Sequence, residues 1–256
     1  MKALLKYDLL YMHKTTKVFI MLGLGIFLAA LSVLTARYMN ELMQYAMAQE
    51  GIGSFPVSEP TVMDAYIQFY SNMQQIFFLV FLFIAGAFFS KDISQGIEQW
   101  LFARPVSKTK YMLSKTLVIH LLGLFGMLVA ALFFAYSTVF IFDGFSFWRF
   151  IGSLFIFYVF VLFFVQLLML LVGLFGRMLW PMLISVLVFF VLSAFSPIDG
   201  GFFKYTPLRL PAYALSFIME DVATGDLIWT IGIGLGLSVL LSILGIFLFN
   251  KQLYKQ

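Results

Sequence analysis

The polar stretch 90–115 carries the side chains best suited to chemistry, and the chemistry that they suit is binding rather than catalysis. Seven of its 26 residues are charged, yet four apolar residues follow a helical spacing of i, i+4, i+7 and i+8. These four residues are Ile93, Ile97, Trp100 and Leu101. A short helix with such a stripe can lie on a lipid surface or dock into a cytosolic protein, and the periodicity alone slightly favours lipid.

Local signals set the expected limits of this amphipathic helix. Pro105 is expected to end it, because the residue before a proline is displaced from the α region. Ser107 or Thr109 is then expected to cap the helix that follows. The polar side chains fall largely off the apolar stripe: Asp92, Gln95, Glu98, Gln99 and Arg104.

Catalytic signatures are missing from the sequence. No Gly-Lys dipeptide occurs, so a Walker loop that cradles nucleotide phosphates is excluded. There is no HExxH, no GxSxG and no cysteine, and the two histidines, His13 and His120, lie far apart. We therefore expect no catalytic residue, no metal site and no cofactor held by this chain.

Six stretches contain no charged residue, although the chain has 28 charged side chains. A charge at the centre of a bilayer costs roughly 2.5–3.5 kcal/mol, and about 20 apolar helical residues cross its hydrocarbon core. With 62% hydrophobic residues and a mean hydropathy of +1.00, the chain is expected to be one all-α transmembrane domain, residues 1–256. The six predicted spans are about 18–36, 70–89, 116–142, 150–175, 178–195 and 227–249.

Few polar residues interrupt these spans. None of the spans contains Asp or Glu, which argues against a self-sufficient proton-coupled transporter. Gln166 is a possible pathway residue, although an intramembrane glutamine more often bonds a neighbouring helix. His120 is expected to pack rather than to switch protons. The pair Gly232-x-x-x-Gly236 favours close helix packing, inside the subunit by default and in a dimer as the alternative.

Three segments outside the spans have predicted structure. Residues 1–17 mix leucines with lysines and predict an amphipathic helix on the inner membrane surface, with an unstructured basic anchor as the alternative. In the loop 37–64, the first helix is expected to overrun to about residue 48, and a second is expected to begin near Pro60. The segment 196–226 predicts short helices that dip into the outer leaflet or pack on the bundle.

The basic residues predict an orientation. With the N-terminus in the cytoplasm, 12 of 16 Lys and Arg face inward, which is a strong positive-inside bias. The prediction is a multi-pass plasma-membrane protein with both termini in the cytoplasm. Contact with membrane lipid accounts for the net charge of +4, so no nucleic-acid partner is expected.

The stretch 90–115 resembles the corresponding stretch of ABC-2 type transporter permeases. In that family an acidic residue leaves span two, a Gly and then leucines follow, then Pro-(Val/Leu)-Ser-(Arg/Lys), and a Lys stands at the next span. Ile97 stands here where Thr is usual, and Trp100 stands beside the expected Leu. The matching residues are Asp92, Gly96, Leu101, Pro105, Val106, Ser107, Lys108 and Lys115.

This resemblance implies the membrane subunit of an ABC exporter for a hydrophobic or amphipathic substrate. Residues 90–104 would contain the coupling helix, which seats in a groove on a separate ATPase subunit that binds ATP and Mg. A second copy of this chain or a paralogous permease would complete the path. The implied apolar anchors are Ile93, Ile97, Trp100 and Leu101, and the implied polar rim is Glu98, Arg104 and Lys108.

Two other classes of function remain as alternatives. A non-transport membrane protein, serving as an anchoring, immunity or scaffold protein, would use 90–104 on lipid and need no ATPase. An intramembrane enzyme is the third class, and no acid–base or metal cluster in the sequence supports it.

Overall fold

The computed structural model is a helical bundle, and it describes residues 1–49, 59–103, 106–175, 179–195, 201–220 and 223–252. Within these ranges every regular element is a helix and no strand occurs. The elements are α1 (Lys2–Lys14), α2 (Thr16–Gln49), α3 (Val62–Asn72), the π-helix η1 (Met73–Phe77), α4 (Phe78–Ser94), α5 (Ile97–Phe102), α6 (Lys108–Ile141), α7 (Phe147–Phe175), α8 (Leu179–Phe195), the 3-10 helices η2 (Gly201–Tyr205) and η3 (Pro207–Arg209), α9 (Leu210–Ile218) and α10 (Thr224–Gln252).

Five helical runs in the described ranges are long and apolar enough to cross a membrane. They are Thr16–Glu41, Val62–Asp92, Lys108–Ile141, Phe147–Phe175 and Thr224–Lys251. The all-α fold predicted from the sequence is therefore confirmed for the described residues, and the apolar helices suggest a membrane-embedded protein. The fifth predicted span, 178–195, corresponds to α8, which has 17 residues and reaches about 25 Å at 1.5 Å per residue.

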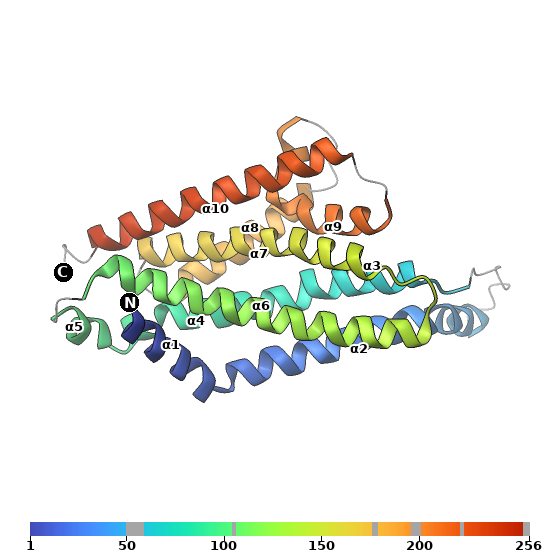
Figure 1. Ribbon diagram of the computed structural model, residues 1–256, viewed down its shortest axis with the longest axis horizontal. Helices are drawn as coiled ribbons and strands as arrows, with labels where there is room; N and C mark the ends of the chain where they lie inside the picture. The colour runs from blue at the N-terminus through green and yellow to red at the C-terminus, as the bar shows by residue number, and fades with distance from the viewer. Residues whose placement is uncertain (50–58, 104–105, 176–178, 196–200, 221–222, 253–256) are drawn as a thin grey trace.

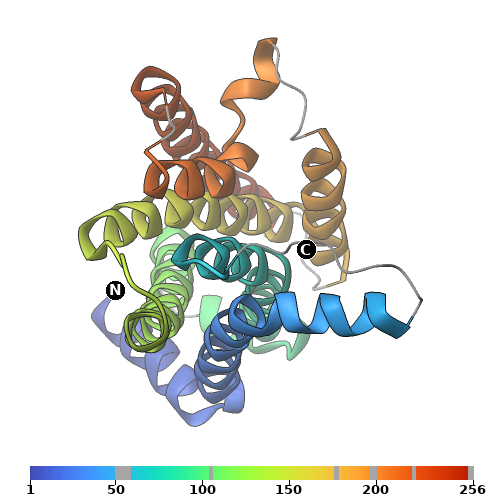
Figure 2. The same ribbon diagram turned by 90° about the vertical axis from the view of Figure 1, so that its right-hand side faces the viewer.

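The bundle is elongated, and its two ends differ. Figure 1 shows that the N-terminus, α1, α5 and the last turns of α10 lie at one end, while α3 begins and α9 lies at the other. Figure 2 looks along the bundle and shows α7 at its centre. Of the spans, α7 is the most buried. An aromatic cluster of Phe78, Phe160, Phe164 and Phe189 packs α4, α7 and α8 together.

The long loop predicted between the first two spans has the expected helical ends. α2 continues to Gln49, and α3 begins at Val62. Thr61 and Asp64 form a capping box, in which the Thr61 backbone N–H donates to Asp64 Oδ2 at 2.8 Å. The helix start predicted near Pro60 is confirmed, and the cap explains it.

The segment before α10 packs on the bundle, which was one of its two predicted arrangements. In α9, Leu210, Ala214 and Ile218 are buried against α7. A Cβ built on Gly152 of α7 would come within 2.7 Å of the Phe217 ring, so α9 lies close to the α7 backbone.

Close packing of α7 and α10 depends on glycines other than the predicted pair. A Cβ on Gly173 would lie 2.8 Å from the carbonyl oxygen of Gly245, so the two backbones nearly touch there. Gly232 and Gly236 have nothing within 4 Å of their Cβ positions. The prediction that this pair packs inside the subunit is therefore wrong, because it lies on an open face of α10.

The prediction of one amphipathic helix over 90–104 is also wrong. α4 ends at Ser94, and α5 is a separate helix of six residues. Gly96 between them has φ +67°, a left-handed conformation that commonly ends helices and that glycine adopts without a Cβ clash. Ile93 therefore belongs to a different helix from Ile97 and Leu101.

α6 begins where it was predicted to begin, but without the predicted capping hydrogen bond. Ser107 occupies the N-cap position of α6, with extended backbone, but its side chain makes no capping hydrogen bond.

Candidate functional site

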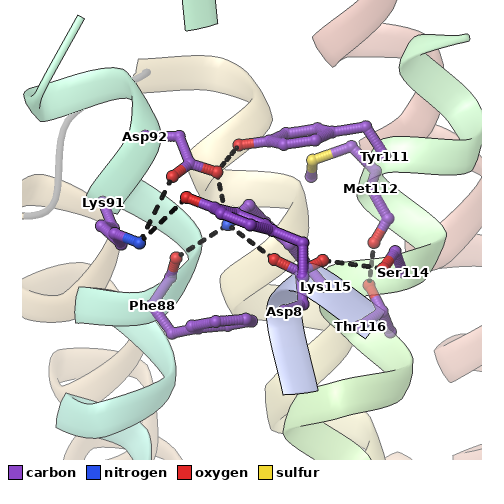
Figure 3. A network of polar contacts seen from close by, with 10 residues as sticks. Asp8, Phe88, Lys91, Asp92, Tyr111, Met112, Ser114, Lys115 and Thr116 are labelled. Atoms are coloured by element: carbon purple, nitrogen blue, oxygen red, sulfur yellow. Dashed lines mark hydrogen bonds and ion pairs between the residues drawn. The ribbon is translucent and has the colours of Figure 1, made fainter. Parts of the chain in front are cut away.

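A buried ionic cluster joins three helices at the end of the bundle that carries the N-terminus. Lys115 Nζ of α6 lies 2.9 Å from Asp92 Oδ2 of α4 and 3.7 Å from Asp8 Oδ1 of α1. It also donates to the Phe88 carbonyl oxygen at 3.3 Å. Figure 3 shows the ammonium between the two carboxylates. Each of the three charged residues is less than 3% exposed.

Two hydroxyls on α6 each donate a hydrogen bond to one of the carboxylates. The Tyr111 hydroxyl donates to Asp92 Oδ2 at 2.9 Å, and the Ser114 hydroxyl donates to Asp8 Oδ2 at 2.7 Å. Tyr111 precedes Lys115 by four residues, so both side chains lie on one face of α6. That face therefore presents donors to α1 and to α4 together.

A second lysine adjoins the cluster. Lys91 Nζ lies 3.3 Å from the centre of the Tyr11 ring, as a cation–π contact, and donates to the Tyr7 hydroxyl at 3.3 Å. It is 3.9 Å from Asp92 Oδ1, beyond hydrogen-bond distance. Two carboxylates thus face two ammonium groups, and α1 contributes a carboxylate and two aromatic rings.

Burial makes this cluster sensitive to the loss of any member. Removing one partner of a buried ion pair costs about 3–5 kcal/mol, because the other charge is left without compensation. Burial raises the pKa of the Asp8 carboxyl, and Lys115 and the Ser114 hydroxyl oppose that effect. Lys115 and the Ser114 hydroxyl therefore both hold the Asp8 carboxylate of α1 against α6.

A cavity of about 520 Å³ lies beside the cluster, between α1, α5 and the start of α6. Its walls are mostly apolar, and the buried residues Asp8 and Asp92 belong to its lining. Asp92 Oδ1 is buried and has no hydrogen-bond partner. The lining residues are Met1, Ala3, Leu4, Tyr7, Asp8, Asp92, Ile97, Leu101, Val106, Ser107, Lys110 and Tyr111.

The structure brings some of the predicted site residues together here. Asp92 and Lys115, singled out as motif residues, form the closest ion pair of the cluster. Ile97 and Leu101, predicted as outward anchors, line the cavity and are only partly exposed. Lys108 opens α6 and is half-buried.

Other predicted residues cannot be placed in this arrangement. The side chains of Ile93, Glu98 and Trp100 lie outside the described part of the chain. Arg104 and Pro105 lie outside it entirely. The predicted docking face is thus described only at Ile97 and Leu101.

Gln166 bonds a neighbouring helix. Its amide nitrogen lies 3.0 Å from His120 Nε2 on α6, and His120 Nδ1 lies 3.1 Å from the Tyr158 hydroxyl. The Tyr158 hydroxyl also reaches the His120 carbonyl oxygen at 3.4 Å. This arrangement suits a neutral His120 with its proton on Nδ1, and it favours the packing role over the pathway role for Gln166.

Sequence reasoning missed Asp8, Tyr111 and Ser114. A signal for Asp8 was present, because it is the one acid in a segment of lysines and leucines. Asp92 and Lys115 also border two neighbouring charge-free stretches from the same predicted side, which places opposite charges at similar depth.

The described ranges contain no group of three or more His, Cys, Asp or Glu residues placed to hold a metal ion. A scan against protein-family models found no matching family, and a search of curated proteins found no matching relative.

Proposed function

We propose that this chain is the permease subunit of an ABC exporter that moves a hydrophobic or amphipathic substrate out of the cytoplasm. A separate ATPase subunit binds ATP and Mg and supplies the energy. The observation that carries the proposal is the 2.9 Å ion pair between Asp92 and Lys115. Asp92 is the first residue of the permease-like motif and Lys115 is the last. Their contact brings the two ends of the motif together at the junction of α4, α5 and α6.

The arrangement suggests how movement of α5 reaches the spans. α5 is joined to α4 through Gly96, and Asp92 lies four residues before that glycine. Asp92 is tied to α6 by Lys115 and Tyr111, and Lys115 also faces Asp8 of α1. When the ATPase pair closes on ATP, displacement of α5 shifts α4, α6 and α1 as a group, because the charges resist separation in a buried site.

In this proposal the protein has six spans, with α8 as the fifth, and lies in the plasma membrane with both termini in the cytoplasm. A second copy of the chain or a paralogous permease forms the other half of the path. The positive-inside distribution of Lys and Arg supports the orientation.

A second candidate is a membrane anchoring, immunity or scaffold protein without an ATPase. One surface of α1 favours it. Leu9 and Leu10 are exposed there beside Lys2, Lys6 and His13, which suits an anionic lipid surface.

The two candidates differ in whether the neighbouring reading frame encodes an ATPase with a Walker loop and whether that ATPase co-purifies with this chain. Trp100→Glu is expected to abolish co-purification by placing a charge at an apolar anchor, while the protein still inserts in the membrane. Gln99→Glu is the matched control, because it adds the same charge at a position off the predicted apolar stripe. If Trp100→Glu retains the ATPase as well as Gln99→Glu does, the docking role of α5 is wrong.

A further inference from the structure

The second of the five long apolar runs carries two adjacent glutamines near its middle, Gln74 and Gln75, in the π-helix η1. We propose that the surface of η1 with these glutamines pairs with the same surface of a second copy of this chain, through hydrogen bonds between the amides. The inference rests on the membrane-spanning, two-copy arrangement of the function proposed above, but it does not depend on ATPase docking.

The glutamines lie at a depth where lipid offers no hydrogen-bond partner. In the helical run Val62–Asp92, Asp64 and Asp92 are the acids at the two ends. The residue midway between these acids is Phe78, and Gln75 precedes it by three residues, which is about 4.5 Å along a helix. A hydrocarbon core of roughly 30 Å centred on this midpoint therefore contains Gln75 well inside its boundaries.

The two amides stand at the outside of the described bundle. Gln75 is exposed and Gln74 is half-buried, whereas Met73 and Phe77 of the same π-helix are buried. The Gln75 amide nitrogen donates to the Ser71 hydroxyl at 3.3 Å, and this is the only side-chain hydrogen bond that either glutamine makes within the described ranges. Since a glutamine amide has two N–H donors and a carbonyl acceptor, most of this capacity is unused.

The polar surface extends along the helix, and the backbone is irregular at the same place. Gln68 and Ser71 precede Gln75 by seven and four residues, so they share its face, and both are half-buried. The Phe78 N–H donates to the Met73 carbonyl oxygen, five residues earlier, which is the hydrogen bond of a π-helix. Single π turns within α-helices frequently occur at functional sites. The irregular backbone and the exposed amides therefore mark the same position.

A second copy of the chain satisfies these amides. Lipid chains supply neither donors nor acceptors, whereas glutamines in membrane helices form hydrogen bonds across helix interfaces. An amide is both donor and acceptor, so a copy related by a twofold axis presents the complementary group from the same residue. Ile67 and Ile76, which are 40% and 42% exposed, would add apolar contacts beside the glutamines.

The open face of α10 is the rival surface for pairing. From Ile228 to Phe247 its exposed residues are all apolar or glycine, and Gly232 and Gly236 are among them. Lipid chains can cover such a face without leaving a polar side chain unpaired, so this face requires no protein partner. The glutamine surface of η1 does require one, and we therefore favour it.

The test is disulfide cross-linking in membranes of a host that expresses the full chain without any ATPase. Because the natural chain has no cysteine, Ile76→Cys introduces a single thiol beside the glutamines and keeps both of them. Val239→Cys is the matched control, since Val239 is exposed near the middle of the α10 run. After oxidation with copper phenanthroline, Ile76→Cys is expected to give at least fivefold more cross-linked dimer than Val239→Cys on a non-reducing gel.

A second pair of variants tests the amides themselves. In the Ile76→Cys chain, replacing both glutamines by leucine (Gln74→Leu with Gln75→Leu) is expected to lower the dimer yield at least fivefold. Replacing both by asparagine (Gln74→Asn with Gln75→Asn) retains the amides and is expected to preserve at least half of the yield. The SDS unfolding midpoint of each variant checks that the monomer still folds.

Specific results would overturn the proposal. Equal or greater dimer yield from Val239→Cys would assign pairing to another surface, and an unchanged yield after the leucine replacements would remove the role of the amides. Labelling of Ile76→Cys by a water-soluble maleimide without dimer would indicate a water-filled path, and a cross-link to another protein, identified by mass spectrometry, would indicate a different partner. ATPase co-purification is measured separately with Trp100→Glu, so either proposal can fail alone.

Discussion

Replacing Lys115 by methionine should destabilise the protein more than any other single lysine substitution at the same end of the bundle. The change removes the ammonium that faces Asp92 at 2.9 Å and Asp8 at 3.7 Å. With an effective dielectric constant of 20, these attractions amount to about 5.7 and about 4.5 kcal/mol. The desolvation of all three groups offsets part of this sum, so the expected loss of unfolding free energy is about 3–5 kcal/mol.

The measurement is unfolding of the purified protein in mixed micelles with increasing SDS, followed by circular dichroism. Lys110→Met is the matched control, because Lys110 lies on the same helix and is exposed, and its expected effect is within about 0.5 kcal/mol. The combined variant Asp8→Asn, Asp92→Asn and Lys115→Met is expected to recover most of the loss, because it leaves no buried charge without a partner.

The pH dependence gives a second check on the same variant. Burial already raises the pKa of Asp8, and loss of Lys115 raises it further. An acid with a raised pKa in the folded state is most favourable to folding when it is protonated, at low pH, and this benefit is lost as the pH rises through the folded-state pKa. The defect of Lys115→Met should therefore be largest near neutral pH and smaller in acid. The reasoning fails if Lys115→Met stays within 1 kcal/mol of the natural protein at pH 7, or if the combined variant is no more stable than Lys115→Met alone.

Three further predictions concern backbone geometry and topology. Gly96→Ala should lower the unfolding free energy by about 1–2 kcal/mol, because φ +67° strains a residue with a Cβ, and an unchanged SDS midpoint would contradict it. Gly173→Ala should lower it by about 1–3 kcal/mol, since the new Cβ would press on the Gly245 carbonyl oxygen, whereas Gly232→Ala should be nearly neutral because its Cβ position is open. Equal effects of the two alanines would refute this packing. A single cysteine introduced in place of Glu98 should react with a membrane-impermeant maleimide in inverted vesicles and not in intact cells, and the natural chain has no cysteine to interfere.

The positions of the long helices could be predicted because the bilayer imposes a simple condition on the sequence. Charges are costly in the hydrocarbon core, so charge-free windows mark the helices that cross it. Their ends could not be predicted from the same condition. A helix need not end at the membrane surface, and α2 continues past Arg37 to Gln49.

The break at Gly96 could not be predicted from the helical spacing of the apolar residues. Helical spacing reports only which residues would share a face if the backbone were regular. It does not report a left-handed residue within the run, and Gly96 supplies one. Ile97 and Leu101 keep their common face on α5, but that face lines the cavity instead of standing clear of the bundle.

Only part of the candidate site could be found in the sequence. Asp92 and Lys115 were singled out by motif, and their pairing is a tertiary contact that no local spacing encodes. Asp8 is farther still along the chain, and it meets Lys115 because α1 packs against α6. The cavity depends on the separation of α1, α5 and α6, so its existence could not be predicted from any one segment.

The unequal lengths of the spans determine how the protein responds to bilayer thickness. α2 and α6 have 34 residues each and reach about 51 Å, well beyond a hydrocarbon core of roughly 30 Å. The ends of these two helices carry charged residues, such as Arg37 of α2 and Lys110 of α6, which are favourable near the headgroups and costly in lipid. The described part of α8 reaches only about 25 Å, so lipids with longer acyl chains are expected to thin around it or to strain the Phe78–Phe189 contact that joins α8 to α4.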